Sequence, residues 1–246
     1  MKKILFVGDS LGKGVALDED KKRYFVLKNS FFNLLSQSLD AVMYNVSRFG
    51  ATILQGERLL KSNIEKIDPD IVVIEFGGND CDFAWDDVAR NPSLDHIPKT
   101  PLDTFEKSLN SMIDTVMDKG KKPVLSTLPP LYADNYFKWF TGRDGEKGIR
   151  VLKWLKDVWR IYWWHERYSN CIEYTAKARG ISCLDIRRAF LKEKEFSQYI
   201  CSDGIHPNEQ GHKLIFNAAM EHIKKHASYL LPSGGELKAC DFSGAH

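Results

Sequence analysis

The chain has 246 residues, of which 43% are hydrophobic and 28% are charged. This composition is typical of a globular domain and excludes an intrinsically disordered chain. The formal net charge is only +2, with basic and acidic residues mixed along the sequence. Because no broad electrostatic field results, the composition argues against nucleic acid or an anionic membrane surface as a partner. It does not indicate an oligomeric state.

The five cysteines are scattered, and none lies in a C-x-x-C pair of the kind that binds zinc or exchanges disulfides. They favour a reducing compartment. Lys2 and Lys3 precede only four apolar residues, too few for the core of a signal peptide, and no apolar run is long enough to span a membrane. As the sequence stands, we expect a cytoplasmic protein, although a signal peptide removed before this N-terminus would leave no trace.

Short apolar runs recur along the chain in the pattern of buried parallel strands. They lie at 4–7, 41–46, 71–76, 123–127 and 181–184. Stretches with helical spacing, such as 53–67 and 105–117, separate them. This alternation predicts an α/β fold with a mostly parallel sheet of about five strands and helices on both faces. Ligands of such sheets bind beyond the carboxyl ends of the strands, so we expect the functional site there.

The end of the sequence predicts a final helix at about 208–226. Pro-Ser-Gly-Gly at 232–235 then indicates irregular chain. A single α/β domain of this length is ordinary, so we expect one domain at 1–228 and a loose tail at 229–246.

The segment 129–168 is too long for an ordinary connection between a strand and a helix, and it holds five of the six tryptophans. Val151, Leu155, Val158 and Tyr162 recur at helical spacing, which predicts an amphipathic helix packed on the domain. We interpret the segment as an aromatic-rich insertion. It is either a lid over the site or a helix hairpin buried against the core, and we prefer the second interpretation for most of its aromatic residues.

The first predicted strand ends in Gly8-Asp9-Ser10-Leu11-Gly12, which places a serine at the carboxyl edge of the sheet. A tight turn assisted by glycine can expose its hydroxyl there. A serine after a strand more often caps a helix or forms a turn. Ser10 by itself is therefore only a candidate nucleophile.

A serine hydroxyl needs a base to take its proton and a further group to orient that base. The segment Asp203-Gly204-Ile205-His206-Pro207 offers both on one loop. Gly204 gives this loop freedom to turn, and Asp203 can then accept from Nδ1 of His206 while Nε2 faces Ser10. The competing interpretation is a loop around a helix start, with Pro207 near the first turn and Asn208 capping the helix.

Acyl transfer also needs hydrogen-bond donors for the oxyanion that develops in the transition state. Gly77-Gly78-Asn79-Asp80 follows the third predicted strand, so the Asn79 amide can donate at the same edge of the sheet. Gly50, after the second strand, offers a backbone N–H without a side chain in the way. Asn and Asp after a strand are also common turn formers.

These blocks closely resemble, in order and spacing, the four conserved blocks of the GDSL or SGNH hydrolases, and the resemblance spans roughly 4–226. It implies a three-layer α/β/α sandwich similar to flavodoxin. It also implies that Ser10, His206 and Asp203 form a catalytic triad in a serine esterase or acylhydrolase. Ser10, Gly50 and Asn79 would form the oxyanion hole. No cofactor and no metal are implied.

Two other nucleophile or phosphate motifs fit less well. Gly8-x-Ser10-x-Gly12 also matches the nucleophile elbow of α/β-hydrolases, but there the serine follows several strands and the acid and histidine lie on separate loops. The glycine-rich segment 8–14 contains Lys13 but lacks the glycine spacing and the Ser or Thr of a phosphate-binding loop.

A metal site is a further alternative. Asp203, His206 and His212 would need another convergent ligand, and the sequence has no His-Glu-x-x-His helix. The main alternative keeps the fold and changes the function to a non-hydrolytic acyl- or sugar-binding module or an acyltransferase.

Substrate choice should depend on loops above the edge of the sheet. Tyr132, Tyr136, Phe137 and Trp139 follow the fourth predicted strand, so we expect them to line the substrate pocket. Stacked aromatic rings suit a sugar and an apolar cleft suits an acyl chain. The expected substrate is therefore a small-molecule or carbohydrate ester, either acetylated carbohydrate or a short-chain or lipid-like ester.

Overall fold

The structure is a computed structural model that describes residues 1–142 and 145–232. Within these residues, five parallel strands form one sheet. The order is β4 (Ala41–Asn45), β1 (Lys2–Gly8), β5 (Ile71–Glu75), β6 (Lys122–Ser126), β7 (Ser182–Leu184). Numbered by position among these five, the order is 2-1-3-4-5, as in flavodoxin. The predicted fold class is confirmed, and the chain order reverses where β1 lies between β4 and β5.

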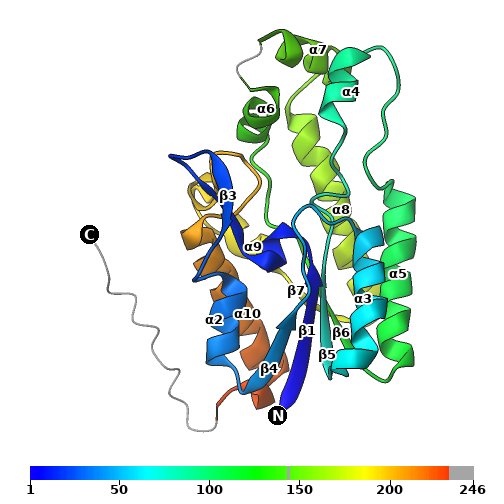
Figure 1. Ribbon diagram of the computed structural model, residues 1–246, viewed down its shortest axis with the longest axis vertical. Coiled ribbons are helices and arrows are strands. Elements are labelled where there is room, and N and C mark those ends of the chain that lie inside the picture. The colour runs from blue at the N-terminus through cyan, green and yellow to red at the C-terminus, as the bar shows by residue number, and fades with distance from the viewer. Residues whose placement is uncertain (143–144, 233–246) are drawn as a thin grey trace.

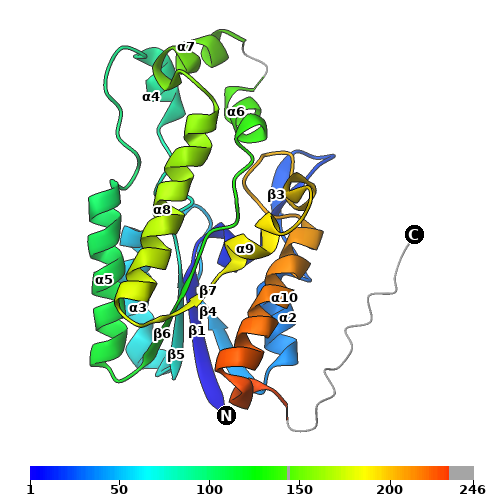
Figure 2. The same cartoon turned by 180° about the vertical axis from the view of Figure 1, so that it is seen from behind.

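Helices cover both faces of the sheet and make it the middle of three layers (Figure 1; Figure 2). On one face lie α3 (Ile53–Ile67), α5 (Leu102–Asp118) and α8 (Trp159–Ala178), and on the other α2 (Phe31–Ser38), α9 (Ile186–Leu191) and α10 (Glu209–His226). Successive side chains of a strand point to opposite faces. Accordingly, Leu5 and Val7 pack beneath the first layer, and Ile4 and Phe6 beneath the second.

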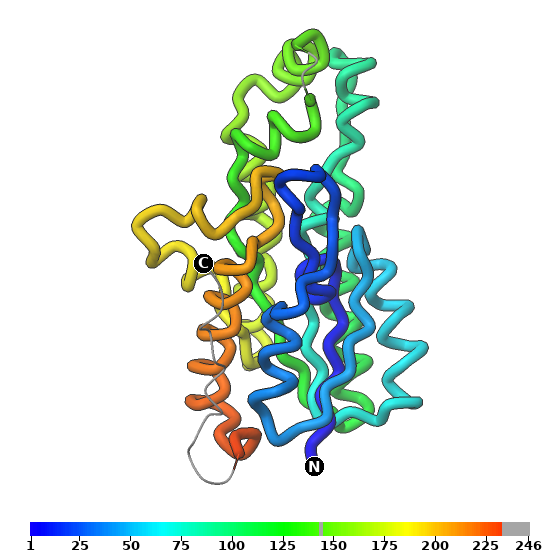
Figure 3. Tube along the Cα trace, turned by 60° about the vertical axis from the view of Figure 1, so that its left-hand side comes forward, coloured from blue at the N-terminus to red at the C-terminus, as the bar shows by residue number. Residues whose placement is uncertain are grey.

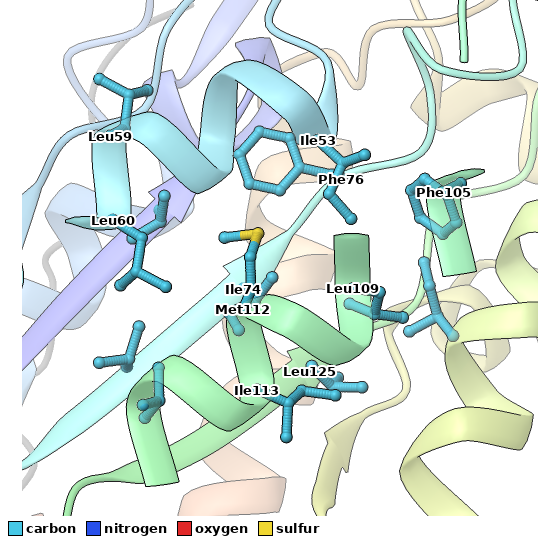
Figure 4. Packing of buried hydrophobic residues seen from close by; sticks show 14 of the residues in the cluster. Ile53, Leu59, Leu60, Ile74, Phe76, Phe105, Leu109, Met112, Ile113 and Leu125 are labelled. Atoms are coloured by element: carbon cyan, nitrogen blue, oxygen red, sulfur yellow. The ribbon is translucent and has the colours of Figure 1, made fainter. Parts of the chain in front are cut away.

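The core beneath the first layer is formed mainly by α3, α5 and the middle strands. Leu60 of α3, Met112 and Ile113 of α5, and Leu125 of β6 are fully enclosed in it (Figure 4). Their helical and strand spacing explains why the sequence predicts these elements with nearly their observed bounds.

A small hairpin near the N-terminus was not among the predicted elements. After the short helix α1 (Ser10–Lys13), β2 (Val15–Asp18) pairs antiparallel with β3 (Arg23–Val26). The hairpin lies beside the loop that leads into α10 (Figure 3). Leu17 donates its backbone N–H to Sγ of Cys201 at 3.5 Å, which links the two.

The aromatic-rich segment forms helices above the carboxyl ends of the strands (Figure 1). They are α6 (Ala133–Thr141), α7 (Gly145–Leu155) and the start of α8, and they pack with α4 (Trp85–Arg90). Val151, Leu155 and Val158 lie in this cluster as predicted, but the helix is broken after Leu155, where Lys156 has a left-handed φ of 68°. Since α8 continues to Ala178, no structural boundary falls at 168.

The C-terminal region contains the 3₁₀ helix η1 (Phe196–Tyr199), α10 and the 3₁₀ helix η2 (Ser228–Leu230). The prediction for α10 is confirmed, and Asn208 caps it by accepting from the backbone N–H of Gly211 at 3.0 Å. Leu230 is buried and accepts from the backbone N–H of Asp40 at 2.9 Å, so packing extends into the start of the predicted tail. Positions 233–246 of that tail lie outside the described residues.

Candidate active site

Ser10 lies at the carboxyl end of β1, as its position in the sequence predicts. It is the first residue of α1, and its side chain lines a cavity. The neighbouring Asp9 caps this helix, since its Oδ1 accepts from the backbone N–H of Leu11 at 2.9 Å. Asp9 therefore performs the capping role that the competing interpretation gave to Ser10, and the Ser10 hydroxyl is left for another partner.

That partner is His206. Its Nε2 lies 2.9 Å from Oγ of Ser10, and its Nδ1 lies 2.7 Å from Oδ2 of Asp203. The other oxygen of Asp203 accepts from the backbone N–H groups of Ile205 and His206 at 3.0 and 3.1 Å. Two segments 193 residues apart in the sequence, at Ser10 and at Asp203, are thus joined in one chain of hydrogen bonds.

Asp203 is fully buried, and burial acts to raise its pKa. The hydrogen bond and charge of His206, together with the two backbone N–H groups, outweigh burial and hold the pKa of Asp203 below its usual range. Asp203 is therefore a carboxylate across the neutral range, able to orient the imidazole and to stabilise a positive charge on it.

Gly204 lets the loop from Asp203 to His206 turn, and it also lets the loop pack tightly. Its φ is +79°, and a Cβ there would lie 2.4 Å from the backbone N of Tyr136 and 2.5 Å from the backbone O of Tyr132. The backbone N–H of Tyr132 donates to the carbonyl of Gly204 at 2.8 Å. The loop is thus fixed against the start of α6.

Two aromatic rings that the sequence analysis did not single out hold the imidazole in place. The Tyr24 ring of β3 lies 4.9 Å from the His206 ring, and the Phe49 ring is stacked on it at 6.0 Å between centroids. Burial, followed by the charge of Asp203 and a hydrogen bond to it, raises the pKa of Tyr24. The Tyr24 hydroxyl is therefore a donor beside Asp203. Only a prediction of the hairpin could have revealed it.

The predicted oxyanion donors lie around the same cavity. Ser10, Gly50 and Asn79 all line it. Nδ2 of Asn79 donates to Oδ2 of Asp9 at 2.9 Å, which fixes the amide while leaving it a second N–H. Gly50 has a left-handed φ of +71°, and a Cβ there would meet nothing within 4 Å. Its glycine is therefore required by backbone conformation and not by crowding.

A buried pair of carboxyl groups lies beneath the turn that carries Ser10. Oε2 of Glu75, at the end of β5, accepts from the backbone N–H of Asp9 at 3.3 Å. Burial raises the pKa of Asp9 to about 6, while burial and then the charge of Asp9 raise the pKa of Glu75 well above its usual range. The sequence carried a signal for Glu75, since it is the one charged residue in the apolar run 71–76.

The cavity has a volume of about 150 Å³. Besides the residues above, its wall contains the apolar and aromatic side chains of Leu11, Phe83, Trp85, Leu128, Leu131, Tyr136, Ile161 and Trp164. One side of the cavity therefore carries Ser10 and His206, and much of the remainder is apolar.

Of the four aromatic residues predicted to line the pocket, Tyr136 does so. Its hydroxyl donates to Asp82 at 2.6 Å. The others pack elsewhere: Tyr132 against Phe196, Phe137 against Phe140, and Trp139 behind Tyr24. Trp139 thus supports a lining residue without being part of the wall itself.

Within residues 1–142 and 145–232, no cluster of three His, Cys, Asp or Glu residues is arranged to hold a metal ion. His212 is stacked on Phe31, whose backbone N–H donates to its Nδ1 at 3.4 Å. Cys81, Cys171, Cys183 and Cys201 are free thiols. In the same part of the chain, no helix is both long and apolar enough to cross a membrane.

Known proteins resemble this chain over most of its length. The arylesterase of Vibrio mimicus is 27% identical over 140 residues, which make up 56% of this chain and 61% of that relative, so less than two thirds of the relative is matched. The crystal structure of the lipase/acylhydrolase from Enterococcus faecalis is similar with a TM-score of 0.63 at 22% identity, covering 95% of this chain and 99% of that one. An acetyl xylan esterase is similar with a TM-score of 0.60 at 18% identity, covering 90% and 99%.

These two structures show the fold. The sequence model described as the GDSL-like Lipase/Acylhydrolase family matches residues 6–214, a range that includes each block on which the resemblance in the sequence rested. The chain belongs to the GDSL-like lipase/acylhydrolase family.

Proposed function

We propose that this protein hydrolyses carboxylic esters through a Ser10–His206–Asp203 triad and an acyl-enzyme intermediate. The observation that carries the proposal is the position of the His206 imidazole, 2.9 Å from Oγ of Ser10 and 2.7 Å from Oδ2 of Asp203. A base within hydrogen-bond reach of a serine hydroxyl, itself oriented by a buried carboxylate, is the arrangement that activates a serine nucleophile.

In the first half of the reaction, Oγ of Ser10 forms a bond to the ester carbonyl carbon while Nε2 of His206 takes the hydroxyl proton. The carbonyl electron pair moves onto oxygen, where the backbone N–H groups of Ser10 and Gly50 and the Asn79 amide stabilise it. When the intermediate collapses, the carbon–oxygen bond to the alcohol breaks and His206 returns its proton to the departing alcohol.

In the second half, a water molecule attacks the acyl group on Ser10 and gives a proton to His206. Collapse then releases the carboxylic acid, and the proton returns to Oγ of Ser10. Asp203 stays ionised throughout and stabilises the imidazolium that forms in each half, which is consistent with its lowered pKa.

The size of the cavity supports a short acyl or aryl group as the part of the substrate that it encloses. A cavity of about 150 Å³ holds a group of roughly the size of benzene. An arylesterase and an acetyl xylan esterase among the similar proteins are consistent with small aryl and acetyl esters. A long acyl chain would have to extend outside this cavity.

The central test is hydrolysis of 4-nitrophenyl acetate together with labelling by a fluorophosphonate probe. We expect turnover and labelling at Ser10, and loss of both in Ser10→Ala. His206→Ala should lose turnover while the protein remains folded by circular dichroism. Retained hydrolysis in a clean Ser10→Ala preparation would refute the mechanism.

The same experiment separates the alternatives on this fold. Neither labelling nor turnover would favour a binding module, whereas transfer of the acetyl group to an added alcohol in preference to water would favour an acyltransferase. Asn79→Ala should lower kcat by about 100-fold or more if its amide meets the oxyanion. An unchanged kcat would remove Asn79 from the oxyanion hole.

A further inference from the structure

The wall of the cavity that α8 contributes contains one polar side chain among apolar ones. Ile161, Trp164 and His165 of α8 all line the cavity. Ile161 belongs to the apolar cluster that joins α4, α6 and α7, and Trp164 packs against it. His165 lies one residue further along the helix and is only 5% exposed.

Nδ1 of His165 is enclosed and has no hydrogen-bond partner among the described residues. Burial, and then the neighbouring cation of Arg187, lower the pKa of His165 to about 3. Arg187 is itself paired with Glu166, with 2.7 Å between Nη2 and Oε1, and is not an acceptor for the ring. The imidazole is therefore neutral at physiological pH, with one N–H and one lone pair.

The surroundings of the His165 ring determine which of its two nitrogens carries the proton. A neutral imidazole donates from one nitrogen and accepts at the other. Nδ1 is enclosed and has no acceptor nearby, so a proton on Nδ1 could not form a hydrogen bond. Nε2 is the ring nitrogen that remains to contact a molecule in the cavity. The favoured tautomer thus carries its proton on Nε2.

Keeping such a group in an apolar wall lowers the stability of the fold, because a buried polar atom without a partner loses its interactions with water. An apolar side chain of the same length would avoid that loss. A residue that weakens the fold at a lining position of the active-site cavity is typical of a residue that serves binding.

We propose that His165 donates a hydrogen bond from Nε2 to an oxygen atom in the acyl or alcohol part of the ester that enters the cavity, in addition to the oxygens of the ester group itself. The site then favours esters that carry an ether, hydroxyl or carbonyl oxygen at that position over esters with plain hydrocarbon there. This inference rests on the proposed ester hydrolysis, and it makes His165 a specificity-determining residue rather than a member of the triad.

The test uses two pairs of esters in which one CH₂ is replaced by O. In the acyl pair, 4-nitrophenyl butanoate is compared with 4-nitrophenyl methoxyacetate. In the alcohol pair, butyl acetate is compared with 2-methoxyethyl acetate. Within each pair the shape is nearly constant, and comparing variants on the same two esters cancels their different intrinsic reactivity.

Two variants of equal side-chain length supply the comparison. In His165→Met the hydrogen bond is removed, and we expect the preference in kcat/KM for the oxygen-containing ester to fall about 3- to 10-fold in one of the two pairs. In His165→Gln the amide N–H reaches nearly the same place, so most of the preference should return. The Met variant should unfold at the same temperature as the unchanged protein or at a higher one.

An unchanged preference in both pairs in His165→Met would overturn the inference. So would an equal loss on all four esters accompanied by a lower unfolding temperature, since that pattern indicates a structural role. If the Met variant does not fold, the unchanged protein still gives an answer. It must favour the oxygen-containing ester of one pair beyond the ratio found for hydrolysis by hydroxide, and otherwise the inference fails.

Ser10→Ala, measured on the same four esters, tests the proposed function separately. Activity that survives this change refutes the triad, whatever the preference of the His165 variants. An inactive Ser10→Ala beside an unaltered preference in His165→Met would refute only the role of His165.

Discussion

Substitutions of Glu75 test how the turn that carries Ser10 is stabilised. Its carboxyl is 1% exposed, accepts from the backbone N–H of Asp9 at 3.3 Å, and lies so close to the turn that a Cβ on Gly8 would come within 2.6 Å of the same oxygen. Since burial and the charge of Asp9 raise its pKa well above 4.5, we expect Glu75 to be a neutral acid at pH 7. Glu75→Gln, which keeps one acceptor and one donor, should therefore preserve the turn.

Comparison with Glu75→Leu shows how large the loss of kcat should be when the hydrogen bond to Asp9 is removed. The Leu variant leaves the buried N–H of Asp9 without an acceptor, which costs about 1–3 kcal/mol. If that loss is expressed fully in the position of Ser10 at the transition state, kcat falls about 5- to 150-fold, because about 1.4 kcal/mol corresponds to a factor of ten. For Glu75→Gln, we expect kcat within about threefold of the unchanged protein, as no such group is left unpaired.

The pH dependence of the free energy of unfolding tests whether the pKa of Glu75 is raised in the folded protein. Because the pKa of Glu75 is raised in the folded protein, the unfolded chain releases this proton at lower pH, and folding becomes less favourable as pH rises above about 4.5. A glutamine has no proton to release. The difference in free energy of unfolding between Glu75→Gln and the unchanged protein, measured in urea at pH 5 and pH 8, should shift in favour of Gln at pH 8.

Two results would refute this reasoning. If Glu75→Gln reduced the kcat for 4-nitrophenyl acetate as severely as Glu75→Leu, an ionised carboxylate would be required beneath Ser10. The same conclusion would follow if the relative stability of Glu75→Gln stayed constant between pH 5 and pH 8, because a carboxyl that is already ionised at pH 5 takes up no proton on folding.

Two other changes test the surroundings of His206. Tyr24→Phe should lower kcat for 4-nitrophenyl acetate about 3- to 10-fold, because Asp203 loses a donor while the ring on His206 remains. An unchanged kcat would show that the hydroxyl is dispensable. Gly204→Ala should lower the free energy of unfolding in urea by at least about 2 kcal/mol, since it adds a left-handed strain to a clash with the backbone of Tyr136. Gly120→Ala, with a similar φ of +68° but open space around it, should cost only about 1 kcal/mol, and equal losses in the two variants would contradict the packing argument.

The sheet, and the meeting of Ser10 with His206 and Asp203, were predictable because each has a local signal in the sequence. Buried parallel strands are continuous apolar runs, and the carboxyl ends of such strands meet at one edge of the sheet. Knowing only that Ser10 and Asn79 follow neighbouring strands was enough to place them together. Asp203 and His206 lie three residues apart, so they were expected to interact within one loop. Because a serine nucleophile needs a base, this loop could then be assigned to the same edge of the sheet as Ser10.

The hairpin was missed because it lacks such a signal. Its strands are four residues long, Phe25 and Val26 are exposed, and the turn between the strands consists of charged residues at 19–22. Its stability comes from packing on the distant loop around Cys201, which no local pattern shows. Tyr24, which lies against the imidazole, was missed with it.

The aromatic residues that line the cavity were only partly predictable, because their position also depends on tertiary packing. Tyr136 and Phe140, four residues apart on α6, share one face and contact each other at 5.1 Å, whereas Trp139 points toward Tyr24. The sequence places all of these residues after β6, but only tertiary packing fixes how the helix is rotated about its axis. The sequence therefore could not show which aromatic residue of α6 faces the cavity.

The continuity of α8 constrains how this protein can change its specificity. The helix presents Trp164 and His165 to the cavity, and further along it buries Tyr168, Ile172 and Ala176 against the sheet and α5. That wall of the cavity therefore cannot swing open as a hinged lid without unpacking the core that lies between the sheet and the layer of α3, α5 and α8. New substrate preferences are thus expected to arise from replaced side chains on a fixed wall, and substitutions deep in the core at Ile172 should disturb selectivity as well as stability.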